Sequence, residues 1–337
     1  MTARRKRFLS RLTSFLLVVA AALAGANAHA LSPTFRVEMH ALPTLTLTQE
    51  QVLAGTSDGA APATIAAELR LPFVAAARMP AVVMLHGDAG AVSNQIAWSD
   101  ELNALGIAVF MVDSFSGRGA VASGASFATM PESVTSTSRV IDAERALAFL
   151  ARHPRIDPER IAVMGFSSGA RTALVAAQTR FASAFGAAGV GFIAYIALYP
   201  DCNLRYVGDT KSEPGPQRIY IGEADVLTAA DACVRLVDRL RRAGQDAAVT
   251  TYPGAHHAFD AVATTTLIRV PEVLTAARCN LEEVAGGKIV NVDTGRELDE
   301  QDRCIGKGLI AGYDAAADAA TKTAVKTLLI ERFALKP

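Results

Sequence analysis

The sequence predicts an α/β fold in which a mainly parallel sheet is covered by helices on both faces. Short apolar segments, typical of strands buried on both faces, alternate with amphipathic segments of helical period. Hydrophobic residues make up 51 % of the 337-residue chain and charged residues 20 %, which excludes a disordered protein. The equal numbers of basic and acidic residues, 33 each, argue against a nucleic-acid-binding protein. The length fits one large domain or two small ones.

The first thirty residues have the pattern of a secretory signal peptide. A basic region is followed by the short apolar run Phe15–Leu23 and by the small-residue cleavage pattern Ala28-His29-Ala30. The basic residues are Arg4, Arg5, Lys6, Arg7 and Arg11. We expect cleavage after Ala30 and a periplasmic or secreted protein; an N-terminal membrane anchor is the alternative. Without these five basic residues the chain has 28 basic and 33 acidic residues, and no later segment has the length of a transmembrane helix.

Strand-like and helix-like segments alternate along residues 31–337, which we interpret as a single domain. The expected strands are Thr64–Leu71, Ala81–Leu85, Ile107–Val112, Ile161–Met164, Phe192–Leu198, Arg218–Ile221 and Ala248–Tyr252. The expected helices are Asn94–Leu105, Ser138–Arg152, one that starts near Ser168, Ala229–Ala243 and Tyr313–Phe333. Thr228 and Asp231 resemble a capping pair at the start of the fourth helix, and Gly244 follows its end.

A Gly-x-Ser-x-Gly motif lies between an expected strand and an expected helix. It consists of Gly165, Ser167 and Gly169 within the segment MGFSSGA. A sharp turn of this kind exposes a serine as a nucleophile, and glycines on either side remove side chains that would obstruct the turn. The alternative is a glycine-rich helix start without chemistry.

A second motif, His86-Gly87-Asp88-Ala89-Gly90, follows the strand Ala81–Leu85. A loop in this position supplies one backbone N–H to an oxyanion hole, and the residue after the nucleophile supplies the other. We therefore expect the N–H groups of Asp88 and Ser168 to form the oxyanion hole. His86 is interpreted as a structural histidine that braces this loop.

Candidates for a general base and its orienting acid follow the last two strands of the sheet. The segment Thr251–Asp260 contains the adjacent histidines His256 and His257. Asp225 follows the preceding strand, where a carboxylate can orient an imidazole and stabilise its charged form. The rival acids are Glu223 and Asp201. The remaining histidines carry no such signal: His153 lies in a polar turn where we expect it to be solvated, and His40 has no visible partner.

Five segments share their order and spacing with a known family. They are LHGDAG at 85–90, VDSFSGRG at 112–119, IDPERIAVMGFSSGA at 156–170, GEAD at 222–225 and YPGAHHAFD at 252–260. Together they cover most of residues 60–260 and resemble the dienelactone hydrolase family of α/β-hydrolases. Ser167, Asp225 and His257 follow the α/β-hydrolase order of nucleophile, acid and histidine. The resemblance points to His257, because in this family the final histidine precedes a small residue and phenylalanine. Founding members use a cysteine nucleophile, so Ser167 argues against dienelactone itself as the substrate.

Three further features lie outside the expected triad and oxyanion hole. Arg118 is a candidate to bind a substrate carboxylate, with a structural ion pair as the alternative. The four cysteines of an exported protein predict two disulfides, and we expect Cys202–Cys233 and Cys279–Cys304, with a free buried Cys233 as the alternative. Their spacing excludes a simple zinc site. Residues 261–312 form an excursion tied by the second disulfide, before a final helix at 313–333.

These observations lead to the expectation of an exported serine hydrolase that acts on small-molecule esters or lactones. No metal ion, organic cofactor, nucleic acid or membrane is expected to take part after signal cleavage, and the oligomeric state is open. A peptidase or a polyester hydrolase fits the same scaffold. A catalytically silent binding protein on this fold is the rival from another class.

Overall fold

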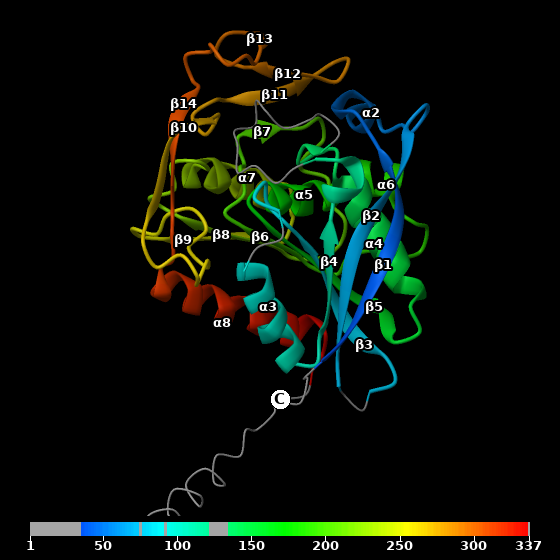
Figure 1. Cartoon of the computed structure of the whole chain (residues 1–337). Helices are drawn as coiled ribbons and strands as arrows, with labels where there is room; N and C mark the ends of the chain where they lie inside the picture. The colour runs from blue at the N-terminus through cyan, green and yellow to red at the C-terminus, as the bar shows by residue number, and fades with distance from the viewer. Residues whose placement is uncertain (1–34, 74–75, 91–92, 121–133, 336–337) are drawn as a thin grey trace, which may run out of the picture. The chain divides into compact units, whose positions relative to one another are not determined.

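A computed structural model describes residues 35–73, 76–90, 93–120 and 134–335 (Figure 1). The expected signal peptide therefore lies outside the described residues. The chain divides into two units, residues 1–34 and 35–337, and everything that follows concerns the second unit. Within the described ranges, no helix combines the length and the apolar character that a membrane span needs.

The centre of the fold is an eight-stranded sheet with the strand order β1-β2-β4-β3-β5-β6-β8-β9. Its strands are β1 (Phe35–Thr46), β2 (Ala61–Pro72), β3 (Met79–Leu85), β4 (Ala108–Asp113), β5 (Ile156–Phe166), β6 (Tyr195–Leu198), β8 (Gln217–Gly222) and β9 (Ala247–Tyr252). The strands from β4 to β9 pair in parallel, whereas β2 pairs antiparallel with both β1 and β4. The predicted mainly parallel sheet is confirmed, although β1 was not anticipated.

Helices cover both faces of this sheet (Figure 1). They are α2 (Gln49–Ala54), α3 (Ser93–Ala104), α4 (Val140–Arg152), α5 (Ser168–Ala176), α6 (Thr179–Phe185), α7 (Ala230–Arg242) and α8 (Ala315–Arg332), with a 3₁₀ turn η1 at Ser116–Arg118. Helices α4 and α6 pack into the core on one face, and α3, α7 and α8 pack into the core on the other. On β3, Val83 and Leu85 join the first core while Val82 and Met84 join the second. This two-sided burial explains the unbroken apolar runs in the sequence.

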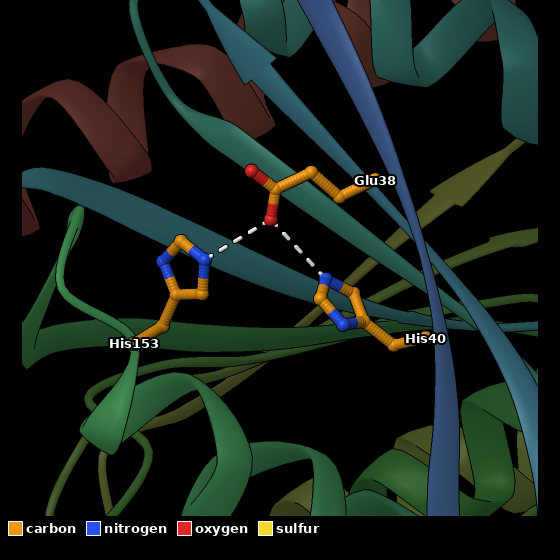
Figure 2. Close-up of side chains that lie close together, drawn as sticks. All are labelled: Glu38, His40 and His153. Carbon is orange, nitrogen blue, oxygen red and sulfur yellow. Dashed lines mark hydrogen bonds and ion pairs between the residues drawn. The ribbon is translucent and has the colours of Figure 1, made fainter.

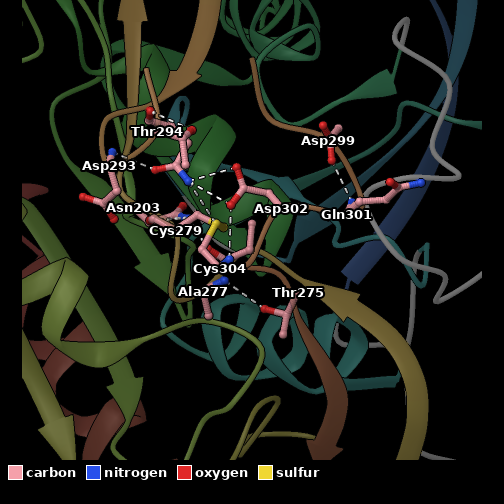
Figure 3. The surroundings of a disulfide bond; sticks show 12 residues. Asn203, Thr275, Ala277, Cys279, Asp293, Thr294, Asp299, Gln301, Asp302 and Cys304 are labelled. Carbon is pink, nitrogen blue, oxygen red and sulfur yellow. Dashed lines mark hydrogen bonds between the residues drawn. A yellow bond between two sulfur atoms is a disulfide. The ribbon is translucent and has the colours of Figure 1, made fainter. Parts of the chain in front are cut away.

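The predicted excursion contributes all but one strand of two small sheets. Strands β10 (Ile268–Thr275) and β14 (Gly306–Ala311) form one sheet. The other consists of β11 (Leu281–Val284), β12 (Lys288–Asn291), β13 (Arg296–Glu297) and β7 (Leu204–Arg205). The expected disulfides Cys202–Cys233 and Cys279–Cys304 are both present. Figure 3 shows the second one, whose Cys279 carbonyl accepts a hydrogen bond from Asn203. The excursion is therefore joined to the main sheet near the end of β6.

Candidate active site

Ser167 lies at the turn between β5 and α5 with the unusual backbone angles φ 52° and ψ −121°. Two glycines make this turn possible. A Cβ atom on Gly165 would lie 2.0 Å from the carbonyl oxygen of Gly169, and one on Gly169 would lie 2.3 Å from the carbonyl oxygen of Leu85. Backbone atoms cannot move aside as a flexible side chain can, so only glycine fits at either position. The strained turn leaves the Ser167 side chain partly accessible, as a nucleophile requires.

The structure brings Ser167, His257 and Asp225 into one hydrogen-bonded chain. His257 Nε2 lies 3.0 Å from Ser167 Oγ, and His257 Nδ1 lies 2.7 Å from Asp225 Oδ2. An ionised carboxylate only accepts hydrogen bonds, so Nδ1 carries the proton and Nε2 is free to accept the Ser167 proton. These distances are those of a nucleophile, its base and the group that orients the base.

Asp225 is held by its own loop. Its Oδ1 accepts hydrogen bonds from the backbone N–H groups of Leu227 and Thr228, each at 2.9 Å, and its Oδ2 accepts one from Thr228 Oγ1 at 2.7 Å. The carboxylate is fully buried beside His257. The expected capping role of Thr228 is wrong, because Ala229 is the N-cap of α7 and makes no side-chain cap. The Thr228 hydroxyl is used instead to orient Asp225.

The loop that carries His257 is anchored in the core. Ala258 has a positive φ of 54°, and the ring of Phe259 is completely buried. The Tyr199 ring packs edge-on against His257, with 4.7 Å between ring centres. The reversal at Ala258 and the buried Phe259 therefore fix the direction in which the imidazole projects.

A buried polar network beneath this loop was not found in the sequence. Asp260 accepts hydrogen bonds from Trp98 Nε1 at 2.7 Å and Tyr199 Oη at 2.8 Å, and Asn94 donates to Tyr199 Oη at 3.0 Å. Burial raises the pKa of Asp260, and these hydrogen bonds act against that shift. Asp260 lies within the histidine segment, but no sequence signal connects Asn94 or Trp98 with it.

The rival residues lie outside the hydrogen-bonded chain. His256 Nδ1 donates to the carbonyl of Ala224 at 2.9 Å. Glu223 accepts a hydrogen bond from Thr251 at the surface, and Asp201 pairs with Arg171. Of the candidates from the sequence, His257 and Asp225 are therefore the two that the structure brings to Ser167.

The His86–Gly90 loop packs directly against the turn at Ser167. A Cβ atom on Gly87 would lie 3.1 Å from Ser167 Cβ. His86 braces the loop, because its Nδ1 donates to the Gly87 carbonyl at 2.7 Å and its Nε2 accepts from the Ser114 N–H at 3.1 Å. Burial, together with the charge of Arg139, lowers the pKa of His86 to about 4, so this imidazole is neutral.

The sequence matches the family model described as "Dienelactone hydrolase family" over residues 65–284, which is well over half of the chain. This chain belongs to the dienelactone hydrolase family. The sequence matches no curated protein. Two similar solved structures share its fold: a Klebsiella pneumoniae protein assigned to the dienelactone hydrolases (15 % identity, TM-score 0.57) and a dienelactone hydrolase-like promiscuous phosphotriesterase from metagenomic libraries (18 % identity, TM-score 0.55). Each comparison covers 88 % of this chain and 99 % of the other.

In this dienelactone hydrolase family member, Arg139 lies buried behind the loop of the expected oxyanion hole. Its guanidinium donates to the His86 carbonyl at 2.8 Å and to Ser168 Oγ at 2.6 Å, and Ser168 Oγ in turn donates to Asp88 at 2.6 Å. These bonds join the two segments whose N–H groups are expected to hold an oxyanion. Arg139 could not be found from the sequence, since a single arginine at a helix start has no recognisable pattern.

The structure places Arg118 in a buried ion pair with Asp142, which is the structural alternative to its expected contact with a substrate carboxylate. Its guanidinium makes two 2.8 Å hydrogen bonds to Asp142, and both side chains are buried. It also donates to the carbonyls of Ser114 and Leu45. Because these partners already use its donors, Arg118 ties β1 to α4, as its structural alternative predicted.

The excursion reaches the two loops that carry Asp225 and His257. Thr275 Oγ1 donates to the carbonyl of Leu227 at 2.8 Å, next to the backbone that holds Asp225. The N–H of Gly312 donates to the carbonyl of His257 at 3.0 Å. The match to the family model ends at residue 284, so the Gly312 contact comes from beyond the matched range.

Proposed function

We propose that this dienelactone hydrolase family member is an exported serine hydrolase that cleaves carboxylic esters or lactones. The observation that carries the proposal is the chain of hydrogen bonds from Ser167 through His257 to Asp225, with distances of 3.0 and 2.7 Å. Family membership and the glycine-flanked turn at Ser167 support the same chemistry.

The proposed reaction follows from the roles that these groups can perform. His257 Nε2 accepts the proton of Ser167 as its Oγ attacks the carbonyl carbon, while Asp225 stabilises the resulting imidazolium. The N–H groups of Asp88 and Ser168 stabilise the negative oxygen of the tetrahedral intermediate. His257 then gives its proton to the leaving alcohol, and water activated by the same imidazole releases the acyl group from Ser167.

The first experiment tests whether Ser167 is a reactive nucleophile. A fluorophosphonate probe should label the wild-type protein at Ser167, and Ser167→Ala should not be labelled. Ser168→Ala serves as the matched control, because its hydroxyl already bonds Asp88 and Arg139 and should not be the labelled group. Absence of labelling in folded wild-type protein would favour a silent binding protein on this fold.

The second experiment addresses the substrate class. A panel of p-nitrophenyl esters, lactones, acetylated sugars, peptides, polyesters and a phosphotriester separates an esterase from a peptidase or polyester hydrolase. The phosphotriester is included because one structural neighbour is described as a promiscuous phosphotriesterase. We expect the highest turnover with an ester or lactone.

Export is proposed from the sequence of residues 1–30. The intact mass of protein from the native host should correspond to a chain that begins at Leu31. Retention of the first thirty residues would instead support the membrane-anchor alternative.

A further inference from the structure

Glu38, His40 and His153 form a cluster on the edge strand of the sheet. Glu38 and His40 are two residues apart on β1, so their side chains project to the same side of the strand. His153 follows the last residue of α4. Figure 2 shows the three side chains converging, with both imidazoles directed at one carboxylate.

The three potential ligand atoms have the spacing of a small metal site. Glu38 Oε2 lies 3.2 Å from His40 Nε2 and 3.2 Å from His153 Nε2. All three atoms lie within 4.8 Å of one another. Tetrahedral zinc with nitrogen and oxygen ligands places neighbouring ligand atoms about 3.3 Å apart. Two of the three separations therefore already match, and the third, between the two imidazole nitrogens, is at most 4.8 Å.

The surroundings hold these side chains in place while leaving access for an ion. The His40 ring packs against Phe149, with 4.7 Å between ring centres, which restricts its rotation. Arg36 pairs with the other oxygen of Glu38, so Oε2 stays directed at the imidazoles. Side-chain exposures of 24 % for His40, 23 % for Glu38 and 10 % for His153 give an ion and a water molecule a way in.

We propose that Glu38, His40 and His153 bind one divalent transition-metal ion of the zinc type, with water as the remaining ligand. Two imidazoles and one carboxylate are ligands that zinc accepts, whereas magnesium and calcium prefer oxygen ligands alone. On binding, each imidazole coordinates through Nε2 and carries its proton on Nδ1. Without the ion, Nδ1 of His153 accepts a long 3.3 Å hydrogen bond from the Arg155 N–H. This bond is lost when Nδ1 carries the proton.

The role of this ion is to fasten the edge strand to the core. His153 precedes β5, whereas Ser167 follows the far end of the same strand. The ion would connect β1 to the turn between α4 and β5 without reaching the triad. It should therefore raise thermal stability and leave the chemistry of Ser167 unchanged.

This site could not be predicted from the sequence. His40 had no visible partner, because Glu38 is common as a surface residue and His153 lies more than a hundred positions away. The expectation that His153 is solvated is wrong, since it is mostly buried against Glu38.

The test is a zinc titration of protein without a polyhistidine tag, after treatment with EDTA. Calorimetry should show one zinc ion bound per chain, and magnesium should not bind. Saturating zinc should raise the melting temperature by about 5 °C. Glu38→Gln and His40→Gln should each remove both effects. His256→Gln is the matched control, since it removes a histidine of intermediate exposure elsewhere and should leave both effects in place.

Equal zinc binding by wild type, Glu38→Gln and His40→Gln would overturn the proposal, as would the absence of stoichiometric binding. If either variant fails to fold, anomalous diffraction at the zinc edge from wild-type crystals decides the question, because the ion must lie among these three side chains. The titration is repeated in Ser167→Ala, where zinc should bind as in wild type. Failure of the metal site and failure of the proposed hydrolase activity are therefore distinguishable.

Discussion

The turn at Ser167 and the two loops of Asp225 and His257 reach the same site by different physical means. The turn is fixed by close backbone contacts that only Gly165 and Gly169 permit. The loops are fixed by hydrogen bonds, some within the Asp225 loop itself and others from distant residues such as Thr275 and Gly312. Steric constraint on the backbone thus positions the nucleophile, while hydrogen bonds from near and distant residues position the base and the acid.

The largest expected effect comes from the nucleophile itself. Ser167→Ala should lower kcat/KM for ester hydrolysis by at least about a thousandfold, because no acyl-enzyme can form. The turn should survive, since alanine removes only the hydroxyl, and circular dichroism and the melting temperature check this. Near-normal turnover by a folded Ser167→Ala protein would remove the basis of the proposed mechanism.

The two adjacent histidines, His256 and His257, test whether the second loop presents the expected base to Ser167. His257→Gln should lower the rate by about two to four orders of magnitude, the range for loss of a general base. His256→Gln should retain most activity, because His256 bonds the carbonyl of Ala224 and does not reach Ser167. The measurement is kcat for each purified, folded variant. A reversed ranking would show that the loop presents the other histidine to the nucleophile.

A smaller effect is expected from the contact between the excursion and the Asp225 loop. Thr275→Val removes the hydrogen bond to the Leu227 carbonyl while keeping the shape of the side chain. We expect kcat to fall by about tenfold or less with little change in KM, because a small displacement of Asp225 misaligns His257.

The matched control for this change is Thr294→Val. Its hydroxyl lies in the same excursion but contacts the Asn291 carbonyl. Figure 3 shows Thr294 close to the disulfide. Equal losses of kcat in the two variants would mean that the excursion acts on the triad only through general stability.

The smallest effect on activity is expected at Glu144, which lies on helix α4 beside Gly186 at the end of α6. Its side chain is 3 % exposed, and burial, with a contribution from Glu213, raises its pKa to about 8. Below pH 4.5 both folded and unfolded chains hold the proton. Between pH 4.5 and about 8 the unfolded chain releases it first, so this group lowers the free energy of unfolding as pH rises.

Glu144→Gln should therefore be more stable than wild type at pH 8, and the difference should shrink towards pH 4.5. Urea unfolding of both proteins across this pH range measures the difference in stability. At each pH, kcat of Glu144→Gln should equal that of wild type. A constant difference at every pH would mean that Glu144 does not titrate as inferred.

The alternation of strands and helices, the turn at Ser167 and the order of the three triad candidates could all be predicted from the sequence. These features depend on local rules: two-sided burial makes strands apolar, and a tight turn demands glycine within a few residues. The sequence also favoured His257 over His256 through the family resemblance, and the structure places His257 against Ser167.

Which distant side chains meet could be learned only from the folded chain. It paired Arg118 with Asp142, directed the Thr228 hydroxyl to Asp225, and placed Arg139 behind the loop of the expected oxyanion hole. It also brought His153 to Glu38, 115 positions away. Such pairs depend on the register of strands and the packing of helices, which many residues fix together, so no local pattern in the sequence records them.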